Sequence, residues 1–142
     1  MKVEIVTDIT LEPVTLAEVK EALKVTGTGH DTELERLISD CRDYIEQAID
    51  TSVFERELRV TSDRTLEDWE LPLGPVSGIV EITDTDDNYI YTYTGGLTDC
   101  PPRIKRLILD YIKHKYDIDD QAVALPKEIA NQIKLLTRQP GL

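Results

Sequence analysis

The sequence has few of the residues that most often perform catalysis or bind metals. Its 142 residues include two histidines and two cysteines. Cys41 and Cys100 form no C-x-x-C pair, so neither a disulfide framework nor a zinc site is indicated. Glycine-rich phosphate loops, G-x-S-x-G turns and H-E-x-x-H helices are missing as well. We therefore expect no enzymatic activity, no cofactor and no metal.

Long apolar runs are also missing. The first ten residues, MKVEIVTDIT, lack the about seven consecutive apolar residues of a secretion signal, and no segment approaches the roughly 18 residues that cross a bilayer. We expect a chain that stays in the cytoplasm and has no membrane partner. Its length predicts a single domain over residues 1–142, because domains most often contain about 100 to 150 residues, with residues 138–142 as a flexible tail.

Apolar residues at helical spacing predict two helices near each end of the chain. Thr15 and Glu18 form a capping-box pattern, and the glycine-containing segment 26–29 is expected to end that first helix. Asp31 is expected to cap a longer second helix. Its stripe is the clearest pattern in the sequence and comprises Leu34, Leu37, Ile38, Cys41, Tyr44, Ile45, Ala48 and Ile49. Prolines at 101–102 and at 126 mark the starts of two further helices.

Between the helix pairs, apolar and polar residues alternate, which is typical of strands. The alternation at 57–61, 79–83 and 89–93 predicts a small antiparallel sheet, and the proline-containing segment 71–76 interrupts it. The expected fold is mostly α with a small antiparallel β sheet, an α+β fold. In chain order we expect two N-terminal helices, a central β hairpin region and two C-terminal helices.

Charge is unevenly distributed along the sequence. Residues 1–100 hold 8 Lys and Arg against 23 Asp and Glu, whereas residues 101–142 hold 8 against 5. The first part has a net charge of −15 and the second of +3, together the −12 of the whole chain. A strongly acidic protein does not bind nucleic acid or anionic membranes loosely. The asymmetry is expected of a subunit that assembles head to tail or meets an acidic partner.

Two groups of residues suggest catalysis, but a structural role explains each better. His30 and His114 have no orienting partner in the sequence, so a cap region and a solvated helix face are favoured over a general base. The acidic residues at 67–70 raise the hypothesis of an unfamiliar hydrolase, and an exposed loop is the better interpretation.

The segment 84–88 partly matches a calcium-binding loop. Asp84, Asp86 and Asn88 match the first three ligand positions of an EF-hand. Tyr89 replaces the glycine at the sixth position, and Gly95 replaces the bidentate glutamate at the twelfth. A solvated hairpin turn is therefore favoured over a cation site.

Three tyrosines fall on one face of a predicted strand, at 89, 91 and 93. A stacking platform for single-stranded nucleic acid would need basic surroundings, and here the neighbours are acidic. We expect the rings to cover one side of the sheet or to form part of a subunit interface, where amphipathic rings are favoured.

Three passages resemble the small head-tail connector (adaptor, head completion) proteins of siphoviruses and prophages. They are LAEVKEALKV at 16–25 followed by DTELERLI at 31–38, LPLGPV at 71–76 with IVEI at 79–82, and PPRIKRLI at 101–108 leading to Tyr116 and Asp117. The resemblance covers nearly the full chain. It departs after the Tyr-Asp pair, where the family often carries an arginine and this chain has Ile118, Asp119 and Asp120.

The resemblance implies a subunit of a ring, with the portal's symmetry, at the head-tail junction of a virion. Such a ring docks on the portal protein after DNA packaging, offers a platform for the next connector or tail protein, and lets packaged DNA pass through its lumen without specific binding. During assembly it would reside in the host cytoplasm. Candidate residues of the subunit or portal interface are Tyr89, Tyr91, Tyr93, Arg103, Arg106, Lys134 and Arg138.

An alternative function comes from another class of protein. The basic C-terminal helices would form a continuous groove in a nucleic-acid-binding accessory protein. Salt-sensitive binding to duplex DNA distinguishes this alternative from the connector.

Overall fold

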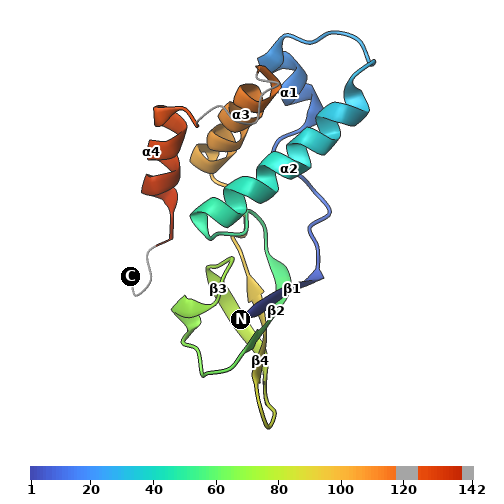
Figure 1. Ribbon diagram of the computed structural model, residues 1–142. Helices are drawn as coiled ribbons and strands as arrows, with labels where there is room; N and C mark the ends of the chain where they lie inside the picture. The colour runs from blue at the N-terminus through green and yellow to red at the C-terminus, as the bar shows by residue number, and fades with distance from the viewer. Residues whose placement is uncertain (118–124, 139–142) are drawn as a thin grey trace. The chain divides into compact units, whose positions relative to one another are not determined.

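The computed structural model describes residues 1–117 and 125–138, without the side chains of Val80 and Asp117. It divides into two compact units. The sheet unit comprises Met1–Thr10, Asp50–Asp99 and the described residue Arg138, and the helical unit comprises Leu11–Ile49 and Cys100–Thr137. Figure 1 shows the helices and strands that each unit contains. The single domain predicted from the sequence stays a prediction.

The helical unit contains the four predicted helices: α1 (Leu16–Leu23), α2 (Asp31–Ile49), α3 (Pro102–Asp117) and α4 (Lys127–Leu136). The capping box is confirmed, since Glu18 N–H donates to Thr15 Oγ1 at 3.2 Å and Thr15 N–H donates to Glu18 Oε1 at 3.3 Å. The first helix ends before the predicted glycines, because Lys24 adopts the left-handed conformation with φ 56°. Asp31 is the first residue of α2, and its carboxylate accepts a hydrogen bond from Lys20 at 2.8 Å.

The core of the helical unit is made by the predicted apolar stripes of its helices. Its buried members on α1, α2 and α3 include Val19, Leu34, Ile38, Cys41, Ile45, Ile104, Leu107, Ile108 and Ile112. Tyr44, which belongs to the predicted stripe, is 44% exposed. Its ring stacks on Tyr111 with centroids 4.6 Å apart, so the stripe ends in an aromatic pair at the surface.

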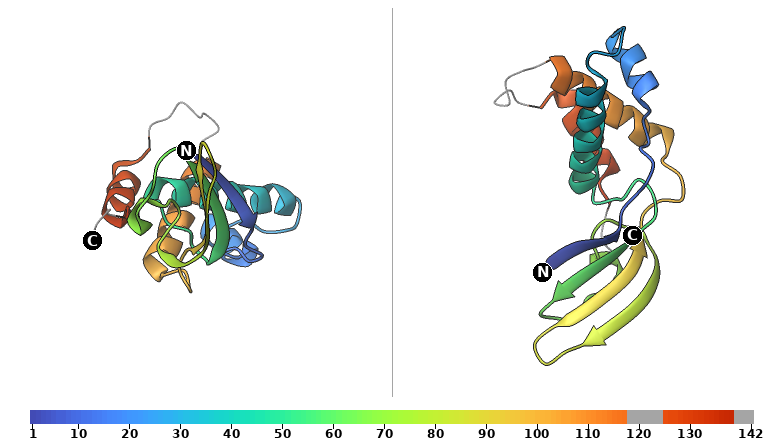
Figure 2. Two further views of the ribbon diagram at one scale, coloured as in Figure 1. Left: turned by 90° about the horizontal axis from the view of Figure 1, so that it is seen from below. Right: turned by 90° about the vertical axis from the view of Figure 1, so that its right-hand side faces the viewer.

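The sheet unit is built on four antiparallel strands in the order β1-β2-β4-β3. They are β1 (Lys2–Thr7), β2 (Arg56–Ser62), β3 (Val76–Asp84) and β4 (Tyr89–Gly95), with the short 3-10 helix η1 (Asp68–Glu70) between β2 and β3. Figure 2 shows β1 and β3 at opposite edges of the sheet. The first strand corrects the predicted order, which began with a helix. Its side chains are mostly exposed, so the alternation that marks a half-buried strand is weak there.

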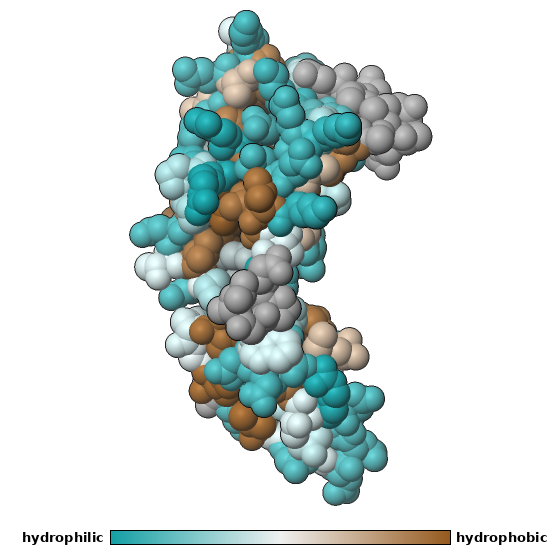
Figure 3. Space-filling view, turned by 90° about the vertical axis from the view of Figure 1, so that its left-hand side faces the viewer, coloured by the Kyte–Doolittle hydropathy of each residue, from teal (hydrophilic) through white to brown (hydrophobic). Residues whose placement is uncertain are grey.

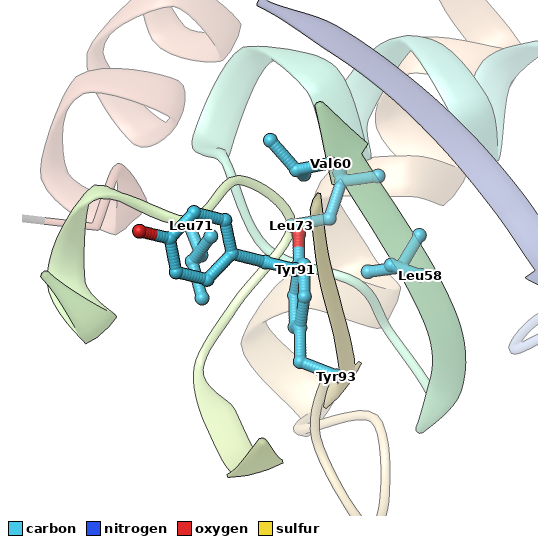
Figure 4. Packing of buried hydrophobic residues seen from close by; sticks show 6 residues of the cluster. All are labelled: Leu58, Val60, Leu71, Leu73, Tyr91 and Tyr93. Atoms are coloured by element: carbon cyan, nitrogen blue, oxygen red, sulfur yellow. The ribbon is translucent and has the colours of Figure 1, made fainter. Parts of the chain in front are cut away.

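The core of the sheet unit lies between the central strands and the segment before β3. Leu58 and Val60 of β2 and Tyr91 and Tyr93 of β4 point to one face, where Leu71 and Leu73 pack on them (Figure 4).

None of the helices within residues 1–117 and 125–138 has the length and the apolar composition needed to span a membrane.

Candidate interaction surfaces

The three tyrosines lie on one face of β4, as predicted. In the register with β2, Tyr91 pairs with Val60 and Tyr93 with Leu58. Tyr91 is 3% exposed and Tyr93 is fully buried. Tyr93 Oη donates to the Pro72 carbonyl at 2.6 Å, and burial raises the pKa of its hydroxyl. Two of the three rings therefore belong to the core of this chain, and only the half-buried Tyr89 leaves part of its surface accessible.

Arg138 is held by the sheet unit. Its Nη2 donates to Asp50 Oδ2 at 2.7 Å and to the Leu71 carbonyl at 2.6 Å, and its Nε donates to the Asp50 carbonyl at 3.0 Å. The guanidinium also lies against Gly74, where an added Cβ would come within 2.7 Å of it. Residues 139–142 of the predicted tail lie outside the described residues. Arg138 thus has a structural role that the sequence did not suggest.

Arg103 and Arg106 are exposed on α3 and line a groove of about 730 Å³ that α4 closes on its other side. The remaining lining residues are Pro102, Leu107, Asp110, Lys113, His114, Pro126, Glu128, Ile129 and Gln132. Asp110 and Glu128 interrupt the basic side chains. The groove therefore offers separate cationic positions, and not the unbroken basic track that binds a nucleic-acid backbone.

Lys134 lies exposed on α4 beside Leu135, which is 77% exposed. Figure 3 views the molecule from the side on which α4 lies, and apolar patches there interrupt a mostly hydrophilic surface. A single exposed leucine is normal on a protein surface, so Lys134 and Leu135 indicate no partner by themselves.

The helical unit contains a buried ionic cluster that the sequence pattern does not predict. Arg42 Nη1 donates to Glu46 Oε1 at 2.7 Å, and its Nε and Nη2 donate to the two carboxylate oxygens of Glu12 at 3.0 and 3.2 Å. Arg42 is 8% and Glu46 1% exposed, whereas the sequence pattern assigns them to the solvated face of α2. Burial would lower the pKa of Arg42, but the hydrogen bonds that Arg42 donates to Glu12 and Glu46, together with the charges of these carboxylates, outweigh burial and raise that pKa. The i, i+4 spacing of Arg42 and Glu46 was the available signal.

The residues considered for catalysis do not come together as a site. His30 is exposed and lies 3.6 Å from a carboxylate oxygen of Glu33. In the acidic segment 67–70, Glu70 forms an ion pair with Arg64, and this pairing lowers the pKa of Glu70. Trp69, which lies between Asp68 and Glu70 in the sequence, is 47% exposed. The sequence favoured an exposed loop, and the structure forms the short 3-10 helix η1 in its place, with residues 67–69 exposed.

The segment 84–88 forms the predicted hairpin turn between β3 and β4. Thr85 N–H donates to the Asn88 carbonyl at 2.8 Å, and Asn88 N–H donates to Thr85 Oγ1 at 3.1 Å. The side chains of Asp84, Asp86 and Asp87 are exposed around this turn. Among the residues that the structure describes, no three His, Cys, Asp or Glu side chains converge as metal ligands.

Residues 13–138 match the model of the phage gp6-like head-tail connector proteins. The chain belongs to this family. The match covers all of the helical unit except its first two residues, and most of the sheet unit. It therefore includes residues of both units. The resemblance noted in the sequence is thereby confirmed, and the chain is a structural connector subunit. No curated protein sequence matches it significantly.

Solved structures share the fold of the connector. A chain from the neck of an empty gene transfer agent particle, computed with C6 symmetry, has a TM-score of 0.76 at 14% identity. A chain from the neck of the native particle, computed with C12 symmetry, has a TM-score of 0.72 at 16% identity. Each comparison covers 100% of the connector and 98% of the other chain. At this identity the similarity shows that the fold is shared over the whole chain.

Proposed function

We propose that the connector is one subunit of a closed ring at the head-tail junction of a phage-like particle. The ring docks on the portal after DNA packaging and provides the platform to which the next connector or the tail attaches. The family match over residues 13–138 carries this proposal. The shared fold with chains of particle necks that were computed with C6 and C12 symmetry supports the ring.

The charges of the chain suit a ring of identical subunits. A closed ring of more than two copies needs a heterologous interface, in which one face of a subunit meets a different face of the next. The connector has an acidic hairpin in the sheet unit and cationic side chains along the groove of the helical unit. Surfaces of opposite charge in one chain favour head-to-tail contact over contact between identical faces. The net charge of −12 also leaves few cations to retain DNA that passes through a lumen.

Native mass spectrometry and negative-stain microscopy test the proposal. The concentrated connector is examined alone and after mixing with portal complexes from the same genome. We expect rings, or stoichiometric binding to the portal, because a template offsets the entropy cost of association that a single subunit interface does not offset. Absence of both, with a folded protein, would reject the proposal.

Binding to duplex DNA at low salt tests the alternative of a nucleic-acid-binding accessory protein. We expect no retention of DNA on nitrocellulose, because Asp110 and Glu128 interrupt the basic residues of the α3–α4 groove. Tight binding that weakens steeply with salt would favour the accessory protein instead.

A further inference from the structure

Both outer strands of the sheet have an open edge. In the described part of the chain, β1 pairs with β2 on one side and β3 pairs with β4 on one side, and no strand lies beyond either of them. The right-hand view of Figure 2 shows these two edges. An edge strand presents unpaired backbone N–H and C=O groups, which are a template for a strand of another chain.

The apolar face of the sheet extends to the β1 edge. Val3 lies opposite Val60 and Ile5 lies opposite Leu58 in the strand register. Residues directly opposite each other in a sheet share a face, so Val3 and Ile5 continue the row of buried core residues. They remain 41% and 45% exposed.

The same face extends to the β3 edge. Ile79 lies opposite Tyr93 and Ile82 lies opposite Tyr91, and both tyrosines are buried. Ile79 is 38% and Ile82 56% exposed. The two open edges therefore carry exposed apolar side chains on the same face of one sheet.

The strand directions allow the two edges to pair with each other in a head-to-tail arrangement. Each neighbouring pair in the order β1-β2-β4-β3 is antiparallel, so β1 and β3 run in opposite directions. Copies arranged around a ring axis keep the same orientation relative to that axis, and the β3 edge of one copy then meets the β1 edge of the next. The new pair is antiparallel like the others.

We propose that β3 of one connector subunit pairs with β1 of the next, so that the sheet continues from subunit to subunit. This inference rests on the proposed ring and names the contact that closes it. Charge supports a second copy as the partner. In an antiparallel pair, Lys2 at the start of β1 comes to the end of β3, where Asp84, Asp86 and Asp87 are exposed. The cation of one copy meets the acidic turn of the other.

Face and charge also select a register. Ile82 must lie opposite Val3 or Ile5 if the apolar rows are to join on one face. A register with Ile82 opposite Val3 would place Glu81 against Glu4 of the next copy, and two like charges disfavour pairing. A register with Ile82 opposite Ile5 places Thr83 against Glu4 instead, and we therefore choose this register. The segments involved, Lys2 to Ile5 and Glu81 to Asp84, are free of the irregularities that the register shows elsewhere in β1 and β3.

Cysteine crosslinking tests this register. Ile5→Cys and Ile82→Cys variants are mixed, assembled alone or on the portal, and treated with a short thiol crosslinker. Directly opposite residues have Cβ atoms about 4.5 to 5.5 Å apart, so we expect crosslinked dimers in the mixture and a ladder of oligomers from the double variant. Each single variant alone should give none, because the contact joins different edges. The mixture of Ile5→Cys with Thr83→Cys is the matched control, since Thr83 points to the other face.

Crosslinking of Ile5→Cys or Ile82→Cys with itself would reject the proposal in favour of a two-fold contact between identical edges. A ring that forms without any Ile5–Ile82 crosslink would also reject it, while the proposed function stands. Absence of rings and of portal binding in the unmodified protein would reject the proposed function first, and the edge pairing with it.

Lysine substitution gives an independent readout. Ile82→Lys places a charge on the apolar row at the edge, and we expect at least about a tenfold higher concentration for half-maximal ring formation. Thr83→Lys, the neighbouring substitution on the opposite face, places a cation opposite Glu4 of the next copy and should leave that concentration unchanged or lower it. Both residues are exposed in the single chain, so circular dichroism should show an unchanged fold. Equal ring formation by Ile82→Lys and the unmodified protein would contradict the pairing.

Discussion

Arg138 and Asp50, 88 positions apart in the chain, are joined by a hydrogen bond of 2.7 Å between guanidinium and carboxylate. Asp50 follows the last residue of α2 in the left-handed conformation with φ 54°. Its other carboxylate oxygen accepts from Leu73 N–H at 2.9 Å. One aspartate therefore fixes both the segment before β3 and the end of the described chain.

Removal of the Arg138 side chain should destabilise the sheet unit. In Arg138→Ala, the Leu71 carbonyl and the Asp50 carboxylate lose their cationic donor, and we expect the free energy of unfolding to fall by roughly 1 to 2 kcal/mol. Solvent screens part of the Arg138–Asp50 interaction, because the Asp50 side chain is 40% exposed, and this keeps the expected loss small. Urea denaturation measures the change. Lys134→Ala, at an exposed position on α4, is the control and should change stability by less than about 0.5 kcal/mol.

The buried cluster of Arg42 should respond differently to single and double substitution. Arg42→Met removes the cation that neutralises the buried Glu46, and a loss of about 3 to 5 kcal/mol is expected. Arg42→Met combined with Glu46→Leu removes both charges and should recover a large part of that loss. Chemical denaturation of the unmodified protein, Arg42→Met, Glu46→Leu and the double variant gives the coupling energy. Additive effects of the two substitutions would show that the carboxylate is not stabilised by Arg42.

Gly96→Ala should destabilise the loop that follows β4. Gly96 has φ +125°, and an added Cβ would lie 2.3 Å from the Phe54 carbonyl oxygen. A side chain there is both strained and without space, so we expect a loss of at least about 2 kcal/mol. Gly29→Ala is the matched control, since nothing lies within 4 Å of its Cβ position. A melting temperature of Gly96→Ala equal to that of the control would contradict the described loop.

The native cysteines should react slowly in the folded chain. Burial raises the pKa of the Cys41 thiol to about 12 and that of Cys100 to about 11, from an ordinary value of 9.0. At about pH 8 the thiolate fraction then falls by roughly a thousandfold and a hundredfold, and reaction with a disulfide reagent slows accordingly relative to the denatured chain. The unfolded chain releases these protons at lower pH than the folded one, so stability should also decrease as the pH rises above about 9. Rapid labelling of the buried Cys41 in the folded protein would contradict this prediction.

The predicted single domain implies one unfolding transition. Trp69, the only tryptophan, reports on the sheet unit, and far-ultraviolet circular dichroism reports mainly on the α-helices, which in the described part of the chain all lie in the helical unit. Coincident melting curves from the two signals are expected of one cooperative domain. Two separated transitions would show that the units unfold independently.

The sequence predicted the helices and central strands well because their apolar residues are buried in regular stripes. The Thr15 capping box, the stripe of α2 and the hairpin at 84–88 each depend on local chemistry, which a sequence displays directly. The first strand escaped prediction because Val3, Ile5 and Val6 are all exposed, and without a buried face the alternation that marks a strand is lost.

The candidate contact residues were harder to place, because contact depends on tertiary packing. Tyr91 and Tyr93 were grouped correctly on one face, but only the position of Leu71 and Leu73 shows that this face is covered within the chain. Arg138 was assigned to a flexible tail, because its partner Asp50 lies 88 positions away in the sequence. Arg103 and Arg106 remained at the surface, as their place opposite the apolar stripe of α3 suggests.

The order of segments in the two units constrains how the chain can fold during synthesis. Each unit is made of separate stretches of sequence, and the chain passes between the units after residues 10, 49, 99 and 137. β1 leaves the ribosome with its partner β2 still some fifty residues behind it, and α1 and α2 emerge long before α3. Neither unit is therefore encoded by one uninterrupted stretch of the gene. The apolar core of the sheet unit is complete once β4 has been translated, whereas the core of the helical unit also needs α3 and α4.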